Sequence, residues 1–152
     1  MRATASLLQF RVEEGSYALD VARVERVLRA AEVTRLPDGP DIVCGLINIA
    51  GEIVPVIDMR RRLGLAARET EPSDRFILIR SSDKLVALRV DGVEGVVALT
   101  TQSISGGDVS PPLAVAAADE EGSLVLIQDP EAILSEVDQW RIDDAWSRIP
   151  NG

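Results

Sequence analysis

The sequence predicts an all-β protein with a few short helices, whose strands close into small barrels rather than forming an open sheet. Short apolar runs recur along the 152 residues, and turn residues separate them at close intervals. Hydrophobic residues make up 46% of the chain and aromatic residues only 3%, so Val, Ile, Leu and Ala must build the core. β-Branched residues favour strands because their stiff side chains suit a pleated surface. Closing each sheet removes edges that would otherwise aggregate.

The order of the apolar runs indicates two barrels, interleaved or side by side. Each half of the sequence contains a hairpin, a longer apolar pair and a short closing helix. Helices are predicted over 20–23, 59–63 and 130–134, each beginning at a capping residue or just after one. Strands are predicted over 7–12, 16–19, 24–28, 33–36, the two runs within 43–58 that flank Ala50 and Gly51, 75–80, 84–90, 93–99, 113–118 and 123–128.

Particular polar residues mark the ends of these elements. Asp58 and Asp129 each follow an apolar strand and precede a helical pattern, which is typical of an N-cap. The pair Asp91-Gly92 tolerates positive φ and predicts a type I′ hairpin turn. The three arginines at 60–62 are interpreted as a solvated helix face.

The residue types that are missing exclude most catalytic chemistry. The chain has no histidine and only one cysteine, Cys44, which rules out Ser-His-Asp, Cys-His and the usual zinc sites. No catalytic residue, metal or cofactor is therefore expected. A carboxylate-dependent hydrolase with Asp91 as its acid is an alternative. A ligand-binding barrel is another, and it would need an interior cavity.

Charge and hydropathy point to a cytoplasmic protein. The net charge of −9 repels phosphate backbones and anionic membranes, so no nucleic-acid partner is expected. Cys44 cannot form an internal disulfide, which fits a reducing compartment. No signal peptide is visible and no apolar run is long enough to span a bilayer, so no direct membrane insertion is expected.

Five motifs occur in chain order between Phe10 and about Leu134. They are Tyr17-Ala18-Leu19-Asp20-Val21, Val33-Thr34-Arg35-Leu36-Pro37, Gly45-Leu46-Ile47-Asn48, Gly51-Glu52-Ile53-Val54-Pro55-Val56-Ile57-Asp58-Met59-Arg60 and Val90-Asp91-Gly92-Val93. Together they resemble the CheW family of chemotaxis adaptor, or coupling, proteins. Each motif alone is weak, but the combination is specific and covers most of the chain.

The resemblance implies a fold and a role. The fold is two SH3-like, five-stranded β-barrels packed on a shared hydrophobic interface, within a single CheW-like domain at 6–136. The role is that of an adaptor or scaffold, without enzymatic activity, that couples a CheA-type histidine kinase to chemoreceptors. The implied partners are the regulatory domain of that kinase and the cytoplasmic tip of a methyl-accepting chemoreceptor. The tip would dock in a groove near the junction of the barrels.

Two positions depart from the residues that are usual in the family. The central hairpin has Ala50 where the family usually has an arginine. The third predicted strand has Arg26 where the family usually has an acid. If those two positions form an ion pair, both members are changed together, which costs less than losing one. We therefore expect the fold to be kept and partner specificity to be altered. The candidate partner-binding residues are Arg26, Val27, Asn48, Ile49, Ala50 and Gly51.

Several alternatives stay open at this level. Val27 and Ile49 could be core residues, and Gly51 could matter only for its turn. A scaffold of the same type could bind kinase but not receptor, or the reverse, in a non-chemotaxis chemosensory pathway. The tail at 137–152 carries Trp140 and Trp146 among acids and could form an amphipathic helix. It either packs on its own domain or docks a partner, since Trp is enriched at interface anchors.

Overall fold

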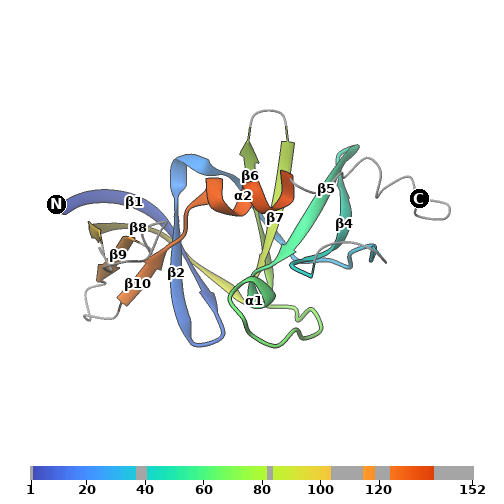
Figure 1. The fold of residues 1–152 in the computed structure, drawn as a ribbon, viewed down its shortest axis with the longest axis horizontal. Helices are drawn as coiled ribbons and strands as arrows, with labels where there is room; N and C mark the ends of the chain where they lie inside the picture. The colour runs from blue at the N-terminus through green and yellow to red at the C-terminus, as the bar shows by residue number, and fades with distance from the viewer. Residues whose placement is uncertain (1, 37–40, 82–83, 104–114, 119–123, 139–152) are drawn as a thin grey trace.

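The computed structural model describes residues 2–36, 41–81, 84–103, 115–118 and 124–138, and these form two five-stranded sheets with short helices beside them (Figure 1). The all-β prediction is confirmed. In chain order the elements are β1 (Arg2–Val12), β2 (Gly15–Asp20), the 3-10 helix η1 (Val21–Arg23), β3 (Val24–Arg29), β4 (Val43–Ile49), β5 (Glu52–Asp58), α1 (Met59–Arg62), β6 (Arg75–Ser81), β7 (Lys84–Val90), β8 (Gly92–Ser103), β9 (Val115–Ala118), β10 (Leu124–Ile127) and α2 (Pro130–Asp138).

The two sheets are interleaved along the chain. The first is a closed barrel in the order β1-β2-β10-β9-β8, so its strands come from both ends of the sequence. Its closure includes a parallel pairing of β10 with β2, at Leu126 and Tyr17. The second sheet has the order β3-β6-β7-β5-β4 and uses the middle of the chain. The second sheet is thus inserted in sequence between the strands of the first, and the two sheets lie side by side in space (Figure 1).

The chain that follows β3 reaches the far edge of the second sheet. Thr34 and Leu46 exchange two backbone hydrogen bonds of 2.9 and 2.8 Å, so this segment pairs with β4. The strand predicted over 33–36 is thus wrong in extent, because only this single bridge forms. Gly45 is required beside it, since a Cβ at position 45 would lie 2.3 Å from the Thr34 carbonyl oxygen.

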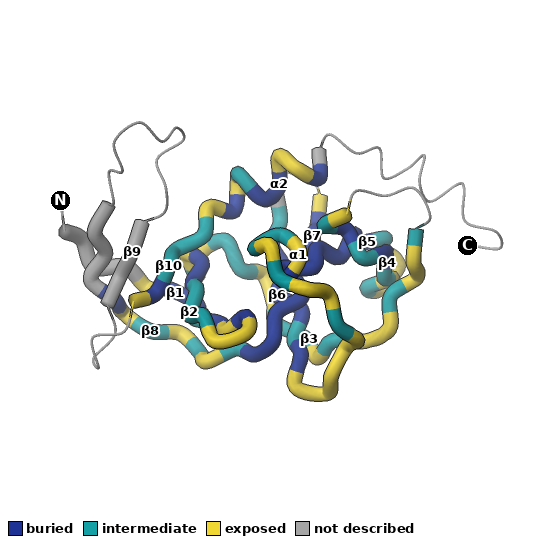
Figure 2. The backbone as a smooth tube through the Cα atoms, turned by 60° about the horizontal axis from the view of Figure 1, so that its bottom comes forward, coloured by how far each residue is buried: buried dark blue, intermediate teal, exposed yellow. Residues whose placement is uncertain are grey.

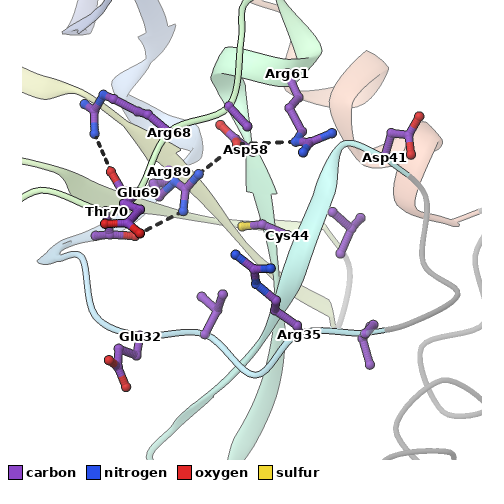
Figure 3. Close-up of a pocket in the computed structure, with 14 residues that line it drawn as sticks. Glu32, Arg35, Asp41, Cys44, Asp58, Arg61, Arg68, Glu69, Thr70 and Arg89 are labelled. Carbon is purple, nitrogen blue, oxygen red and sulfur yellow. Dashed lines mark hydrogen bonds and ion pairs between the residues drawn. The ribbon is translucent and has the colours of Figure 1, made fainter.

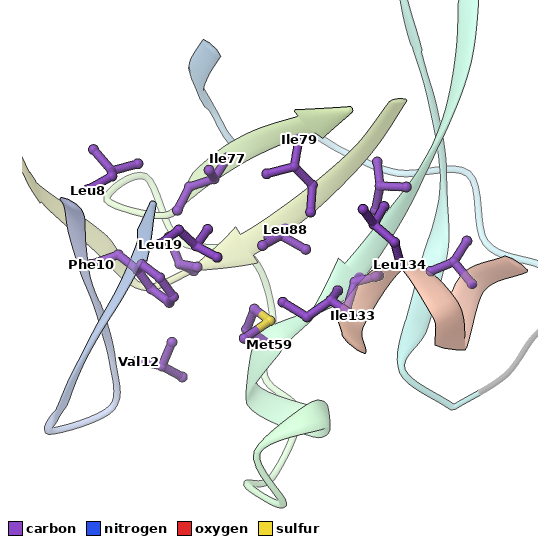
Figure 4. Packing of buried hydrophobic residues seen from close by; sticks show 14 residues of the cluster. Leu8, Phe10, Val12, Leu19, Met59, Ile77, Ile79, Leu88, Ile133 and Leu134 are labelled. Carbon is purple, nitrogen blue, oxygen red and sulfur yellow. The ribbon is translucent and has the colours of Figure 1, made fainter. Parts of the chain in front are cut away.

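A shared core joins the two sheets. Buried residues concentrate where the sheets meet beneath α2 (Figure 2). The side chains come from β1 and β2 of the first sheet, from β5, β6 and β7 of the second, and from α1 and α2 (Figure 4). The shared core consists of Leu8, Phe10, Val12, Leu19, Ile57, Met59, Ile77, Ile79, Val86, Leu88, Val90, Ile133, Leu134 and Val137.

Strands β6 and β7 are buried on both faces, which explains their uninterrupted apolar sequences. Successive side chains of a strand point to opposite faces. Ile77 and Ile79 accordingly enter the shared core, whereas Phe76 and Leu78 enter a second cluster inside their own sheet. A third cluster fills the first barrel, and it contains Leu7, Ala18, Leu99 and Val125.

Three local predictions are confirmed by the helix caps. The Asp20, Asp58 and Asp129 carboxylates each accept a hydrogen bond of 3.0 Å from the backbone N–H two residues later. The last of these helices is longer than predicted: α2 continues to Asp138 because Val137 extends its buried face. The tail prediction for Trp140 and Trp146 lies outside the described residues.

The predicted hairpin turn at Asp91-Gly92 is wrong. β7 before it pairs with β5 and β6, whereas β8 after it pairs with β1 and β9. A hairpin would keep both strands in one sheet, but Asp91 lies at a bend where the chain crosses between the sheets. The pair therefore marks the junction between the two sheets.

The turn between β4 and β5 does have the predicted hairpin form. Ile49 pairs with Glu52, which leaves a two-residue loop with φ of 50° at Ala50 and 90° at Gly51. Two positive φ values are the requirement of a type I′ turn. Glycine adopts this conformation freely, whereas the Cβ of Ala50 makes it costly.

We expect Ala50→Gly to increase the free energy of unfolding by about 0.5–1 kcal/mol, because the backbone at position 50 is left-handed and a Cβ disfavours that conformation. Urea denaturation followed by circular dichroism measures the change. Ala66→Gly, in an exposed loop where φ is negative, is the matched control and should lower stability slightly. Equal losses in both variants would contradict the strain assigned to Ala50.

Candidate functional site

The residues predicted to bind partners lie in two groups on the second sheet. Arg26 and Val27 lie on β3, while Asn48 and Ile49 end β4 and lead into the Ala50–Gly51 turn. Four of them are exposed: Arg26, Asn48, Ala50 and Gly51. Val27 packs on the shared core and Ile49 on the cluster inside the second sheet, so both also contribute to packing.

Arg80 of β6 links these two groups. Its Nε donates to Glu25 Oε1 at 3.0 Å, and its Nη2 lies 3.3 Å from Glu52 Oε1. Glu25 immediately precedes Arg26, and Glu52 immediately follows Gly51. One guanidinium therefore holds both groups at the same end of the sheet. We call this exposed region the Arg80 surface; it comprises Glu25, Arg26, Asn48, Ala50, Gly51, Glu52 and Arg80.

A β-bulge explains how Glu25 and Arg26 are both exposed. The register of β3 against β6 shifts between Val24 and Arg26, so Glu25 is the extra residue. In a regular strand, consecutive side chains point to opposite faces, so one of Glu25 and Arg26 would point inward. A bulge changes these directions and allows both side chains to be exposed. The hydrogen bond from Arg80 lowers the pKa of the Glu25 carboxyl and keeps it charged.

The sequence did not reveal this ion triad. Glu25 and Glu52 stand 55 and 28 positions from Arg80, and no helical or strand periodicity connects them. The only local signal is that each lies near a strand end. Asn48 also has a role that its sequence position hides: its side-chain oxygen accepts a hydrogen bond of 2.8 Å from Gly51 N–H and braces the turn.

A second set of charges is buried around α1 and the crossing at Asp91. Asp91 Oδ2 accepts from the Glu13 backbone N–H at 2.6 Å and from Arg60 Nη1 at 2.8 Å. Asp91 Oδ1 lies 3.0 Å from Arg68 Nη2, which also binds Asp74 Oδ1 at 2.7 Å. The interpretation of Arg60 as a solvated residue is therefore wrong, because its guanidinium is committed to this buried network.

These contacts give Asp91 a structural role instead of a catalytic one. Both of its oxygens are bonded to cations or to backbone, so the hydrolase alternative gains no support from the geometry. Asp58 is similarly committed, since it caps α1 and accepts from Arg89 Nη2 at 2.7 Å. In the part of the chain that is described, every buried side-chain nitrogen and oxygen has a hydrogen-bond partner.

Cys44 of β4 is half-buried and its thiol donates to the Val56 carbonyl oxygen at 3.4 Å. Burial raises the pKa of this thiol to about 11. The thiolate is the nucleophilic form, so Cys44 is poorly reactive near neutral pH. Its sulfur has the properties of a packed apolar atom rather than of a catalytic nucleophile.

The buried network makes a prediction about stability. Asp91→Asn should lower the free energy of unfolding by about 1–3 kcal/mol, because it removes the buried carboxylate charge that Arg60 and Arg68 share and leaves Arg60 with Glu13 and Arg68 with Asp74 and Glu71 as their acidic partners. Glu94→Gln is the control, since the Arg11–Glu94 pair is half exposed and should contribute less than about 1 kcal/mol. Urea titrations of both variants measure the difference; equal small losses would mean that the crossing does not depend on Asp91.

The raised pKa of Cys44 predicts its reactivity. Alkylation by iodoacetamide near pH 8 should be about a hundredfold slower than for free cysteine, whose pKa is about 8.5. The rate should keep rising with pH until the thiolate predominates above about 11. Mass spectrometry of the intact protein measures both rates. A plateau at the pH where free cysteine saturates would show that burial does not govern this thiol.

No helix among the described residues combines the length and apolarity that crossing a bilayer requires. In the same part of the chain, the carboxylates and the thiol form no group that could hold a metal ion.

Comparison with known proteins places these features in a family. Residues 6–138 match the CheW-like domain. Chemotaxis protein CheW of Thermotoga maritima is 28% identical over 134 residues, which are 86% of this chain and 88% of that protein. The Bacillus subtilis protein of the same name is 30% identical over 138 residues, 86% of each chain.

A solved structure supports the same placement. The crystal structure of the scaffolding protein TtCheW from Thermoanaerobacter tengcongensis superimposes with a TM-score of 0.72 at 26% identity, covering 84% of this chain and 86% of that one. With its two sheets, its shared core and a family match over most of its length, the chain belongs to the CheW family, whose members are scaffold or adaptor proteins and not enzymes.

Proposed function

We propose that this protein is a cytoplasmic chemosensory scaffold that couples a CheA-type histidine kinase to the cytoplasmic tip of a chemoreceptor. Its relatives carry the name chemotaxis protein CheW, and one is described as a scaffolding protein. Scaffolding requires only complementary surfaces. The buried acids Asp58, Asp74 and Asp91 are engaged in a helix cap or in ion pairs, and this suits such a role.

We further propose that its partner specificity differs from that of the usual family member, and that the Arg80 surface carries the difference. The observation behind this is the charge pattern: Arg26 is exposed and forms no hydrogen bond or ion pair with any residue that the structure describes. Its neighbour Glu25 is instead bonded to Arg80, which also holds Glu52. Position 50, on the other side of this triad, is an uncharged alanine.

This arrangement would select partners by charge. A partner that presents an acid toward position 26 would gain an ion pair, whereas one that presents a base would be repelled. Coupling between close charges at an interface is about 1.5 kcal/mol or more, which corresponds to about tenfold in affinity. The side chains of Asn48 and Ala50 lie at the same end of the sheet and would contact the same partner.

The test is a binding assay with the kinase regulatory domain and receptor tip encoded in the same genome, and with a receptor tip from a typical chemotaxis system. The native chain should bind its own partners. The double variant Arg26→Glu, Ala50→Arg should bind the typical receptor tip about tenfold more tightly. Arg29→Glu is the control, because Arg29 is also exposed on β3 and the charge change is the same as at position 26.

Several outcomes separate the possibilities. Binding to kinase without any receptor, or the reverse, would identify a scaffold of a non-chemotaxis pathway. If the native chain bound the typical receptor tip normally, and Ala50→Arg changed nothing, altered specificity would be excluded. If it bound no kinase and no receptor, the coupling role itself would be wrong.

A further inference from the structure

A polar cavity of about 670 Å³ lies on the second sheet, apart from the Arg80 surface. It is enclosed by the segment after β3, by β4, by the start of α1 and by residues 67–70 (Figure 3). Its volume falls within the range of about 300–1,000 Å³ that is typical of small-molecule sites. Charged side chains dominate its lining, whereas packing gaps in a protein core are lined by apolar groups.

Four arginines line this cavity, and two of them are already neutralised. Arg89 is bonded to Asp58 at 2.7 Å and to Thr70 at 3.1 Å, and Arg68 is bonded to Asp74 and Asp91. Arg35 has no hydrogen bond or ion pair with any described residue. Among the described residues, Arg61 has only the Asp58 carboxylate as a partner, 4.0 Å away, and Arg89 binds that carboxylate at 2.7 Å.

The side chain of Arg35 and those of two nearby acids have opposite orientations. Arg35 extends toward Cys44 at the centre of the cavity, whereas Glu32 and Asp41 extend away from it (Figure 3). Asp58, the buried acid, is neutralised by Arg89. The remaining acids, Glu32, Asp41 and Glu69, are exposed and surround the site with negative charge. This pattern favours a ligand with one anionic group and opposes a polyanion such as nucleic acid.

We propose that this cavity binds a small molecule through a single oxyanion, a phosphate or a carboxylate, held by Arg35 and Arg61. A guanidinium presents parallel N–H donors that match both groups in a bidentate manner. Half-buried Cys44 and the apolar side chains of Val33 and Val43 supply a wall for the rest of the ligand. The inference does not depend on the coupling role, because it concerns a different set of residues.

Cys44 provides a built-in reporter for this site. Its thiolate displaces iodide from either iodoacetate, which carries a carboxylate, or iodoacetamide, which is neutral, and forms the same S–C bond. The ratio of the two rates cancels the thiolate fraction and measures attraction of the carboxylate. We expect the ratio of iodoacetate to iodoacetamide to exceed that of free cysteine about tenfold, the effect of one charge-assisted hydrogen bond.

Competitors and variants make the test specific. At constant ionic strength, inorganic phosphate and acetate, each replacing chloride, should slow labelling by iodoacetate; the stronger competitor shows which oxyanion the cavity prefers. Arg35→Gln and Arg61→Gln should each return the ratio toward that of free cysteine. Arg29→Gln removes the same charge outside the cavity and should leave the ratio unchanged. Circular dichroism confirms that the variants are folded.

Two results would overturn the proposal. One is a rate ratio equal to that of free cysteine with no competition from either anion. The other is an equal decrease of the rate ratio in Arg35→Gln and Arg29→Gln, which would mean that the overall charge of the protein, and not the cavity, attracts the carboxylate. Both are independent of kinase and receptor binding, so failure here leaves the coupling role intact.

Discussion

Burial of β6 and β7 on both faces is the constraint on which the rest of the structure depends. Sheets of five short strands enclose small interiors, and the clusters inside them contain few residues. The shared core is larger, and it draws side chains from both sheets and from α2. Each fully buried aliphatic or aromatic side chain contributes about 1.5–3 kcal/mol relative to exposure. The interface between the sheets thus supplies much of the stability that neither sheet has alone.

Ion pairs stabilise two regions that lie outside the shared core. The chain leaves one sheet and enters the other at Asp91, where strand pairing is interrupted. Arg60, Arg68 and the Glu13 backbone converge on this carboxylate, and so α1, the loop after it and the β1–β2 turn are tied to the crossing. At the surface of the second sheet, Arg80 of β6 is bonded to Glu25 of β3 and to Glu52 of β5, and so it connects three strands. The first arrangement fixes the fold, and the second leaves its neighbours exposed for contact.

Much of the fold could be predicted from sequence, since strands, caps and the Ala50–Gly51 turn are encoded by neighbouring residues. Asp58 and Asp129 were identifiable as caps because a cap depends on the next two or three positions. The Asp91-Gly92 turn was predicted wrongly because the same dipeptide suits a hairpin and a crossing, and only the partners of β7 and β8 distinguish them. Arg60 was misjudged for a similar reason: its partner Asp91 is 31 positions away. The Arg80 triad and the arginine-lined cavity likewise arise only when distant strands come together.

The interleaved order of the strands bears on how the chain is made. Leu7 on β1 pairs with Val97 on β8, and β2 pairs with β10, the last strand in the part of the chain that the structure describes. A growing chain would complete the whole second sheet before the first barrel could close. Until then β1 and β2 would offer unpaired backbone and an apolar face to other chains. Contacts so distant along the chain also slow folding. Synthesis of this protein therefore includes an interval in which its N-terminal hairpin is open to contact with other chains.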